Sequence, residues 1–327
     1  MAGVEGQPAG TNRPLRPGDS VVVLPLADVL STLDERNALD GVPFMPEMQR
    51  FCGRSFRVSH QVLQAVFDAA FVKGFDGAHV RQFRGGRVYV LEDTRCTGSD
   101  HDNCSRGCRL YWKEAWLGRS TMPTAPRIGP AYEAPERVEL PVRTQEGRYY
   151  CQSSEFLSAT LSISVRARFA KAVKSVWLGN YRLTEMFRMI STWSWWTIRL
   201  RLGFFPRGRP QAEAGDPLDL VPGEVVEVKS FDDIQRTLDE RGRNRGLHFS
   251  SYMRRLCGHR LRVRARADRV IGEGSGIMRE LRNTVILEGA VCDSSHYAFG
   301  GCPKGDFQYW REDWLRRSPE TTTTFPR

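Results

Sequence analysis

The sequence lacks the short motifs that mark several large enzyme classes. It contains no Gly-rich phosphate loop, no dinucleotide-binding glycine fingerprint, no His-Glu-x-x-His and no Gly-x-Ser-x-Gly. Each of these motifs positions a group that its reaction requires, so the sequence excludes these four routes to an enzymatic assignment. Histidine is scarce, with 6 in 327 residues, and none occurs between residues 121 and 221.

Long apolar runs are also absent. No stretch reaches the roughly 20 apolar residues of a transmembrane helix, and residues 1–16 are rich in Gly and Pro without the apolar core of a signal peptide. We therefore expect a cytoplasmic protein with a disordered arm at residues 1–16 and a tail at residues 319–327. In a reducing compartment the 8 cysteines indicate metal binding or catalysis before disulfides.

Positive charge predominates. The formal net charge is +10, and arginine far exceeds lysine. Such a balance favours polyanionic partners, whether nucleic acid, anionic lipid headgroups or an acidic protein. The alternative is a GC-rich bacterial coding sequence, in which arginine simply replaces lysine.

The most informative pattern is a long internal repeat, which we name the first module (residues 17–120) and the second module (residues 222–318). The matching segments are 32–36 with 237–241, Cys52-Gly53 with Cys257-Gly258, and 111–117 with 309–315. A repeat of this length is a domain and not a solenoid unit, whose period is roughly 20–50 residues. The sequence therefore predicts two related domains.

Each module has the pattern of a small β domain. The expected strands are 20–24, 55–59 and 88–91 in the first module, and 225–228, 261–265 and 284–287 in the second. Short helical segments separate the first two strands. We predict a mainly β fold with short helices, in which two duplicated SH3-like barrel modules are joined by a helical insert. The layout is similar to the C-terminal part of the nitrile hydratase β subunit, a resemblance that transfers no catalytic residue.

The segment between the modules, residues 121–221, has a different character. Residues 121–141 are Pro-rich and expected to be extended, residues 157–205 have a helical pattern, and residues 210–222 are expected to be a flexible linker. Trp193, Trp195 and Trp196 are flanked by arginines. We interpret this tryptophan cluster as packing between the modules, and a basic amphipathic helix at a membrane interface is the alternative.

The cysteines that keep their places in both modules predict a metal site in each. The first module offers Cys52, Cys96, His101, Cys104 and Cys108, and the second offers Cys257, Cys292, His296 and Cys302. Three thiolates and one imidazole suit tetrahedral zinc. Cys108 aligns with Asp306, so it replaces or supplements His101 in the first set. We predict structural zinc that staples the long loop of each module.

Two other interpretations of the cysteines stay open. Residues 292–296, Cys-Asp-Ser-Ser-His, resemble the Cys-Asp-Gly-Ser-His segment of the CDGSH proteins, which hold a two-iron cluster through three cysteines and one histidine. The upstream Cys-x-Cys of that family is missing, and iron or an iron–sulfur cluster is the alternative cofactor. The remaining interpretation is buried thiols that pack without metal. Cys151 has no histidine nearby in the sequence to activate it, so we interpret it as a packed thiol.

The recurring aromatic residues favour a core over a ligand platform. Four tryptophans form two pairs with a spacing of four residues: Trp112 with Trp116, and Trp310 with Trp314. That spacing is more typical of packing than of stacking on nucleic acid. The glutamates between them are interpreted as ion-pair partners of the arginines that follow, Glu114 with Arg119 and Glu312 with Arg317.

Three segments carry a resemblance that covers most of the chain: Cys-Gly-x-x-x-Arg-Val, the run Arg-Asn-Thr-Val-Ile-Leu-Glu-Gly from Arg282, and Tyr-Trp-Arg-Glu-x-Trp-Leu. The sequences of these segments resemble those of an uncharacterised family of bacterial proteins, which have the same duplication and a Tyr-x-Cys-Gln segment in the middle. The resemblance implies a bacterial cytoplasmic protein, encoded in biosynthetic or glycan gene neighbourhoods, and no established activity.

Our functional hypothesis is a non-enzymatic binding or scaffold protein that holds a protein partner and is accessory to a biosynthetic pathway. One alternative is a metal- or iron–sulfur-dependent enzyme that uses one of the two sites. Another is a nucleic-acid-binding protein that uses its arginine-rich faces. Peripheral membrane contact through Trp193, Trp195 and Trp196 is a further alternative.

Overall fold

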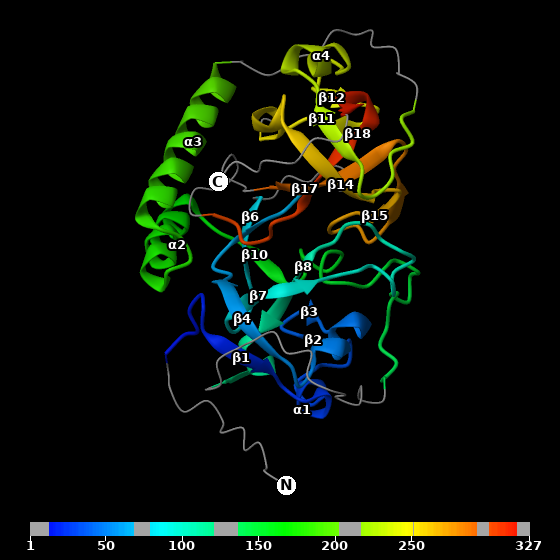
Figure 1. Ribbon diagram of the computed structural model, residues 1–327. Helices are drawn as coiled ribbons and strands as arrows, with labels where there is room; N and C mark the ends of the chain where they lie inside the picture. Colours follow the sequence, from blue (N-terminus) through cyan, green and yellow to red (C-terminus); the bar gives the residue numbers. More distant parts are fainter. Residues whose placement is uncertain are drawn as a thin grey trace.

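The computed structural model describes residues 13–68, 79–120, 137–202, 217–250, 252–292 and 301–318. The fold is mainly β, with two curled half-barrel sheets and few helices, as predicted at that level. Figure 1 shows one sheet in each half of the molecule and the two longest helices along one side. The predicted arm, apart from residues 13–16, and the predicted tail lie outside the described residues.

The first sheet has the strand order β8–β7–β4–β1–β9, with antiparallel neighbours. Its strands are β1 Ser20–Val23, β4 Ser55–Gln61, β7 Val88–Arg95, β8 Arg109–Lys113 and β9 Leu117–Arg119. Shorter elements are α1 Leu26–Leu30, β2 Ala38–Leu39, β3 Val42–Pro43, and the 3₁₀ helices η1 Pro46–Phe51 and η3 Glu114–Trp116. Alternation in β1 buries Val21 and Val23, as expected for a strand with one face on the core.

The second sheet has the matching order β18–β17–β14–β11–β19. Its strands are β11 Val225–Val228, β14 Arg260–Arg266, β17 Thr284–Val291, β18 Phe307–Arg311 and β19 Leu315–Arg317. Shorter elements are α4 Phe231–Arg236, β12 Arg243–Asn244, β13 Leu247–His248, η4 Met253–Leu256, the hairpin β15 Arg269–Ile271 with β16 Met278–Glu280, and η5 Glu312–Trp314. The pairing shifts register after Val58 in β4 and after Val263 in β14. Bulges at matching places bend both sheets in the same way.

The recurring tryptophans form the cores, which confirms the sequence interpretation. All four are completely buried: Trp112, Trp116, Trp310 and Trp314. Trp116 Nε1 donates a hydrogen bond to Thr32 Oγ1 at 2.9 Å, and Trp314 Nε1 donates to Thr237 Oγ1 at 3.0 Å. Both threonines open the repeated Thr-Leu-Asp-Glu-Arg run. The repeated run therefore supplies an acceptor for one of the two indole N–H groups that each core buries.

The recurring glutamates form ion pairs, but the predicted partners are wrong. Glu114 pairs with Arg87 at 3.0 Å, and Glu312 pairs with Arg266 at 3.3 Å. The backbone N–H of Glu114 donates to the Arg87 carbonyl at 2.9 Å, which sets the two side chains next to each other. The arginines that follow pair elsewhere, Arg119 with Asp19 and Arg317 with Glu224.

The middle segment begins as part of the first module's packing. A small sheet consists of β5 Ala65–Val66, β6 Val80–Phe83 and β10 Thr160–Ser162. The predicted helix over 157–205 is therefore wrong for residues 157–163, because those residues turn and then pair with β6. Helix α2, Val165–Leu178, starts after Ser164, whose hydroxyl accepts the Ala167 N–H. It ends at Gly179, whose φ of +83° glycine adopts without strain.

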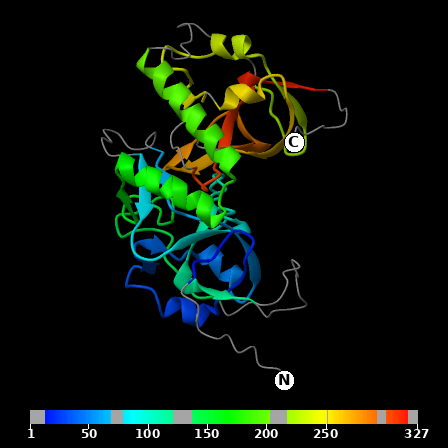
Figure 2. The same cartoon turned by 90° about the vertical axis from the view of Figure 1, so that its left-hand side faces the viewer.

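Helices α2 and α3 (Leu183–Arg201) lie along one side of the molecule. Figures 1 and 2 show both helices on that side, with α3 extending past the second sheet. Their turn is attached to β4, because Gln61 and Asn180 exchange two hydrogen bonds of 3.0 and 2.9 Å. No described helix combines the length and the apolar character that crossing a bilayer would require.

Candidate functional site

The two modules are in close contact through their main chains. The Ser105 N–H donates to the Arg269 carbonyl at 2.7 Å, and in the middle segment the Tyr149 N–H donates to the Gly276 carbonyl of the second module at 2.9 Å. Two further side chains of the second module, Ile271 and Cys302, belong to the hydrophobic core of the first. The segments that meet are residues 96–108, the β15–β16 hairpin and residues 301–307. The modules therefore form one packed body.

Two contacts in this interface are reciprocal. Cys104 Sγ accepts the Ile271 N–H at 3.3 Å, and Cys302 Sγ accepts the Val66 N–H at 3.3 Å. Cys104 and Cys302 are matching positions of the repeat, and so are Val66 and Ile271. Each module thus offers the same thiol to the same backbone position of the other, as in a two-fold symmetric dimer.

A cation two residues after each thiol repeats the pattern. Arg106 Nη1 donates to the Ile271 carbonyl at 3.3 Å, and Lys304 Nζ donates to the Val66 carbonyl at 3.3 Å. The thiol and the cation together satisfy both the N–H and the C=O of one residue in the opposite module. A buried backbone amide and carbonyl both need such partners.

Glycines next to the cations allow the close approach. A Cβ on Gly107 would lie 3.0 Å from the Phe307 ring, and a Cβ on Gly305 would lie 3.2 Å from the Arg109 guanidinium. Both glycines have positive φ, +61° and +51°, which also favours residues without a Cβ. Arg95 donates to both glycine carbonyls, at 2.7 and 2.9 Å. Again the two modules meet through matching positions.

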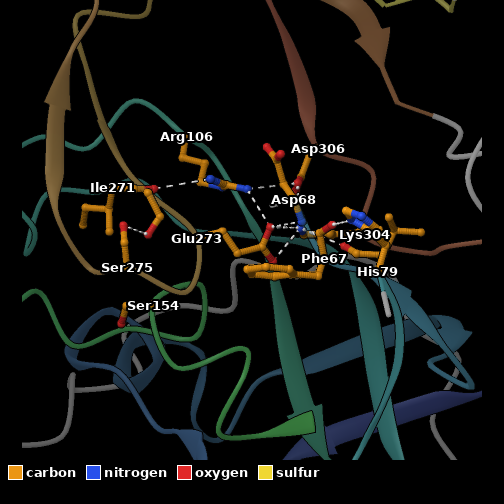
Figure 3. Close-up of polar contacts among 12 residues, drawn as sticks. Phe67, Asp68, His79, Arg106, Ser154, Ile271, Glu273, Ser275, Lys304 and Asp306 are labelled. Carbon is orange, nitrogen blue, oxygen red and sulfur yellow. Dashed lines mark hydrogen bonds and ion pairs between the residues drawn. The ribbon is translucent and has the colours of Figure 1, made fainter. Parts of the chain in front are cut away.

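Two carboxylates neutralise the cations inside the interface, as Figure 3 shows. Glu273 Oε2 lies 2.6 Å from Lys304 Nζ and 3.2 Å from Arg106 Nη2. Asp306 Oδ2 lies 3.1 Å from Lys304 and 3.4 Å from Arg106. The Asp68 backbone N–H also donates to Glu273, at 3.0 Å. We name these four side chains the charged cluster: Arg106, Glu273, Lys304 and Asp306.

The charged cluster keeps three of its members firmly ionised. Burial alone would lower the pKa of Lys304 and of Arg106, but Asp306 and Glu273 raise both pKa values above the ordinary ones. Burial alone would raise the pKa of Asp306, but Lys304 and Arg106 hold it below its usual range. For Glu273 complete burial outweighs both cations and raises the pKa. Opposite charges that compensate one another in this way stabilise a fixed geometry.

The predicted metal ligands of the first module are not gathered into a metal site. In the described part of the chain, no group of three or more His, Cys, Asp and Glu side chains is arranged to hold a metal ion. Cys52 lies in the core at the end of η1, where burial raises the pKa of its thiol to about 11. Burial and the nearby Glu47 carboxylate raise the pKa of Cys96 as well.

The other predicted ligands are also engaged or lie apart. His101 is buried with Nε2 at 3.1 Å from the Tyr150 carbonyl. Burial raises the pKa of Cys108, whose carbonyl accepts the Cys96 N–H at 2.8 Å. Two further predicted ligands lie in the second module. Cys257 lies at the end of η4, and the backbone N–H of Cys292 donates to the Asp306 carbonyl at 2.8 Å. His296 lies outside the described residues, so zinc at the second set stays a prediction.

Sequence reasoning missed the acceptor role of Cys104 and Cys302 and the whole role of Glu273. The signal for the thiols was present, because each stands two residues before a cation in both modules. Glu273 gave no comparable signal. It lies in a loop between β15 and β16, and nothing local shows that the loop is inserted against the other module.

A glutamine side chain of the middle segment is inserted into the first module and hydrogen-bonds to its main chain. Gln152 Oε1 accepts the Tyr111 N–H at 2.8 Å, and Gln152 Nε2 donates to the carbonyls of Tyr111 and Pro43 at 2.9 and 3.1 Å. Cys151 is buried, its Sγ accepts the Ser154 N–H at 3.4 Å, and burial raises its pKa. These contacts agree with the interpretation of Cys151 as a packed thiol.

Apolar side chains are exposed along both long helices, and we name this surface the α2–α3 face. Its members are Val165, Phe169, Val173 and Trp177 on α2, Leu183, Phe187, Trp195 and Ile198 on α3, and Leu202 directly after it. Residues three or four apart lie on one side of a helix, so α2 has a continuous apolar stripe, and α3 has one that is interrupted between Phe187 and Trp195. The inner side packs Ala172 against Met186.

The predicted burial of the tryptophan cluster between the modules is wrong for Trp195, which is 58% exposed. Trp193 packs against the cluster of Ala172 and Met186, between α2 and α3. The side chain of Trp196 is not among those described. The helical hairpin therefore exposes Trp195 on its outer surface.

The chain matches no protein-family model, no curated protein and no solved structure. The resemblances to the bacterial family, to SH3-like barrels and to the CDGSH segment therefore stay expectations. The function is argued from the interface and from the α2–α3 face.

Proposed function

We propose that the protein is a non-enzymatic binding protein, built as an internal dimer of two SH3-like modules, that engages a partner through the α2–α3 face. The exposure of that face carries the proposal: Val173 is 73% and Trp177 is 62% exposed. Contiguous apolar patches on a protein surface usually mark an interaction site. Two adjacent helices bearing such stripes form a patch, whereas isolated exposed apolar residues need no explanation.

The internal dimer is supported by matching strand orders and by reciprocal contacts. The orders β8–β7–β4–β1–β9 and β18–β17–β14–β11–β19 correspond strand by strand. The exchange of thiol contacts between Cys104 and Ile271, and between Cys302 and Val66, follows the rule of an isologous interface. A duplicated module that already formed dimers explains both features.

A binding role is favoured over catalysis by the state of the charged cluster. Glu273 has no solvent exposure and Arg106 has 4%, so a substrate has no route to the carboxylate without separating the modules. The cations and carboxylates neutralise one another. Their arrangement is more typical of ion pairs that hold two modules together than of a catalytic acid–base pair. Zinc stapling, the metal-dependent enzyme and nucleic-acid binding stay predictions.

The proposal is tested with a face variant, Val173→Ser with Phe187→Ser, and a control variant, Val221→Ser with Ile277→Ser. All four side chains are exposed and apolar, but Val221 and Ile277 lie off the α2–α3 face. In lysates of cells producing each protein, gradient centrifugation should find wild type and control variant in a fast-migrating or membrane-associated form. The face variant should migrate as the free chain, because it has lost apolar contact area.

Two results would contradict the proposal. One is wild type that migrates as the free chain under all lysis conditions. The other is a face variant that keeps the association of the wild type. Unfolding curves of the purified variants must match the wild type, since all four positions are exposed and surface substitutions cost little stability.

A further inference from the structure

The α2–α3 face carries basic side chains beside its apolar stripes. Residues 165–202 contain eight lysines and arginines and one acidic residue, Glu185. Arg166, Lys174 and Arg188 are exposed, and none of them forms an ion pair with another described residue. Their charges are available to an anionic partner, and the net charge of +10 points in the same direction.

Apolar and basic side chains are arranged to meet one surface together. At 3.6 residues per turn, the positions Val165, Phe169, Val173 and Trp177 cover an arc of about 120°. On the same scale Arg166 falls within that arc, and Lys174 lies about 60° beyond its edge, on the flank of the stripe. Figure 2 shows α2 and α3 both in front of the two sheets on one side of the molecule.

The hairpin is held by its turn, which leaves the face outward. Asn180, in the turn between the helices, exchanges hydrogen bonds with Gln61 of β4 and donates to Ser175 Oγ at 3.1 Å. The Tyr181 ring lies 5.3 Å from the His60 ring. This buried attachment, together with the packing of Ala167 against Val80 and Ile163, keeps the hairpin in place, so binding does not have to order it first.

We infer that the α2–α3 face is a docking surface for an anionic membrane, on which the protein lies peripherally. The inference deepens the proposed function and rests on it. Lysines and arginines outnumber the single acidic residue of the hairpin by eight to one, and interfacial helices combine Trp, Phe and Leu with a basic polar side. Trp177 and Trp195 are of the type found at headgroup level. The combination on this face is that of a membrane interface.

The test is co-sedimentation of the full-length protein with lipid vesicles. Wild type and the Val221→Ser/Ile277→Ser control should bind vesicles that contain phosphatidylglycerol and should bind phosphatidylcholine vesicles much more weakly. The Val173→Ser/Phe187→Ser variant should lose at least about tenfold in partition coefficient, since two apolar side chains no longer insert. A charge variant, Lys174→Gln with Arg188→Gln, should lose roughly tenfold and with it most of the preference for anionic vesicles.

Each other outcome overturns the inference in a recognisable way. If wild type binds neutral and anionic vesicles equally, the preference for an anionic membrane is wrong. If the face variant and the control variant bind equally, the α2–α3 face is not the binding surface. If no vesicle binds wild type while the lysate association still depends on Val173 and Phe187, the membrane inference is wrong and the proposed function stands, with a protein as the partner. If both assays are negative, both proposals are wrong.

Discussion

At the scale of single residues, the two reciprocal thiols show that a cysteine present in both modules can serve as a hydrogen-bond acceptor in their interface. Sulfur is a weak acceptor, but Cys104 and Cys302 each face a backbone N–H of the other module. Each is almost completely buried. Their role depends on size and position, because the thiol fills space and also faces a donor.

We expect Cys104→Ala and Cys302→Ala each to lower the free energy of unfolding by about 1–3 kcal/mol. Each substitution removes the acceptor of one backbone N–H, which is buried for Ile271 and partly buried for Val66. Urea denaturation measures the change. The loss should be the larger for Cys104→Ala, because the N–H that it leaves without an acceptor is the more deeply buried.

The matched control is Cys257→Ala, which changes a partly exposed thiol at the end of η4. If the thiols act only as hydrogen-bond acceptors, Cys257→Ala should lower the free energy of unfolding clearly less than Cys302→Ala does. Elemental analysis of the same proteins tests the zinc prediction. If the second module holds zinc, Cys257→Ala and Cys302→Ala will both lose the metal and will be equally unstable, and the acceptor account will be wrong.

The sequence predicted residues whose role is local and missed those whose role depends on the other module. The tryptophan spacing predicted a core, because the side chains four apart pack within one module. The Cys₃His sets were inferred from retention alone, and retention does not distinguish a ligand from an interface acceptor. The partners of Glu114 and Glu312 could not be read from spacing, since they are fixed by hairpin contacts of Arg87 and Arg266.

At the scale of elements, the α2–α3 hairpin depends on its contact with β4. His60 of β4 is covered by the Tyr181 ring and has its Nδ1 at 2.8 Å from Ser59 Oγ. Burial and, to a smaller extent, Arg109 lower the pKa of His60 from 6.5 to about 4, and Glu185 of α3 opposes the shift. The folded chain therefore holds a neutral imidazole at the point where the helices attach.

The shift predicts a loss of stability in acid. Between pH 6.5 and about 4 the unfolded chain binds a proton at His60 that the folded chain does not bind, so the free energy of unfolding falls as the pH falls through this window. We expect His60→Gln to remove about 2 kcal/mol of that decline. Urea midpoints across the window measure it, and wild type and variant that decline in parallel would show that His60 is not the cause.

Prediction of this middle region from sequence succeeded only where periodicity was long. The helical pattern located α2 and α3, but it extended into residues 157–163, where β10 pairs with β6. A three-residue strand carries too little pattern to compete with a neighbouring helix. The outward turn of Trp195 was missed because an apolar helix face does not reveal whether a partner within the chain covers it.

At the scale of the whole molecule, the charged cluster decides whether the modules behave as one unit. Replacing Glu273 with Gln leaves Lys304 and Arg106 buried with a single carboxylate between them. We expect the free energy of unfolding to fall by about 3–5 kcal/mol, the usual effect of removing one partner of a buried ion pair. Urea unfolding should then show two transitions where the wild type shows one, because the modules separate first.

A surface ion pair provides the comparison. Glu224 lies 2.9 Å from Arg317, and both side chains are partly exposed, at 25% and 55%. Glu224→Gln should change the free energy of unfolding by less than about 1 kcal/mol and should leave a single transition. Equal losses in the two variants would mean that the charged cluster does not hold the modules together.

The covalent connection between the two modules also removes a constraint that symmetry imposes. In a homodimer every substitution at the axis appears twice, so an aspartate at the place of Asp306 would meet a second copy of itself and the like charges would repel. In this chain the position that matches Asp306 holds Cys108, so the carboxylate occurs once and contacts the cations of both modules. Fusion has thus let the centre of the interface become asymmetric, and each half is free to change while the other keeps the pairing intact.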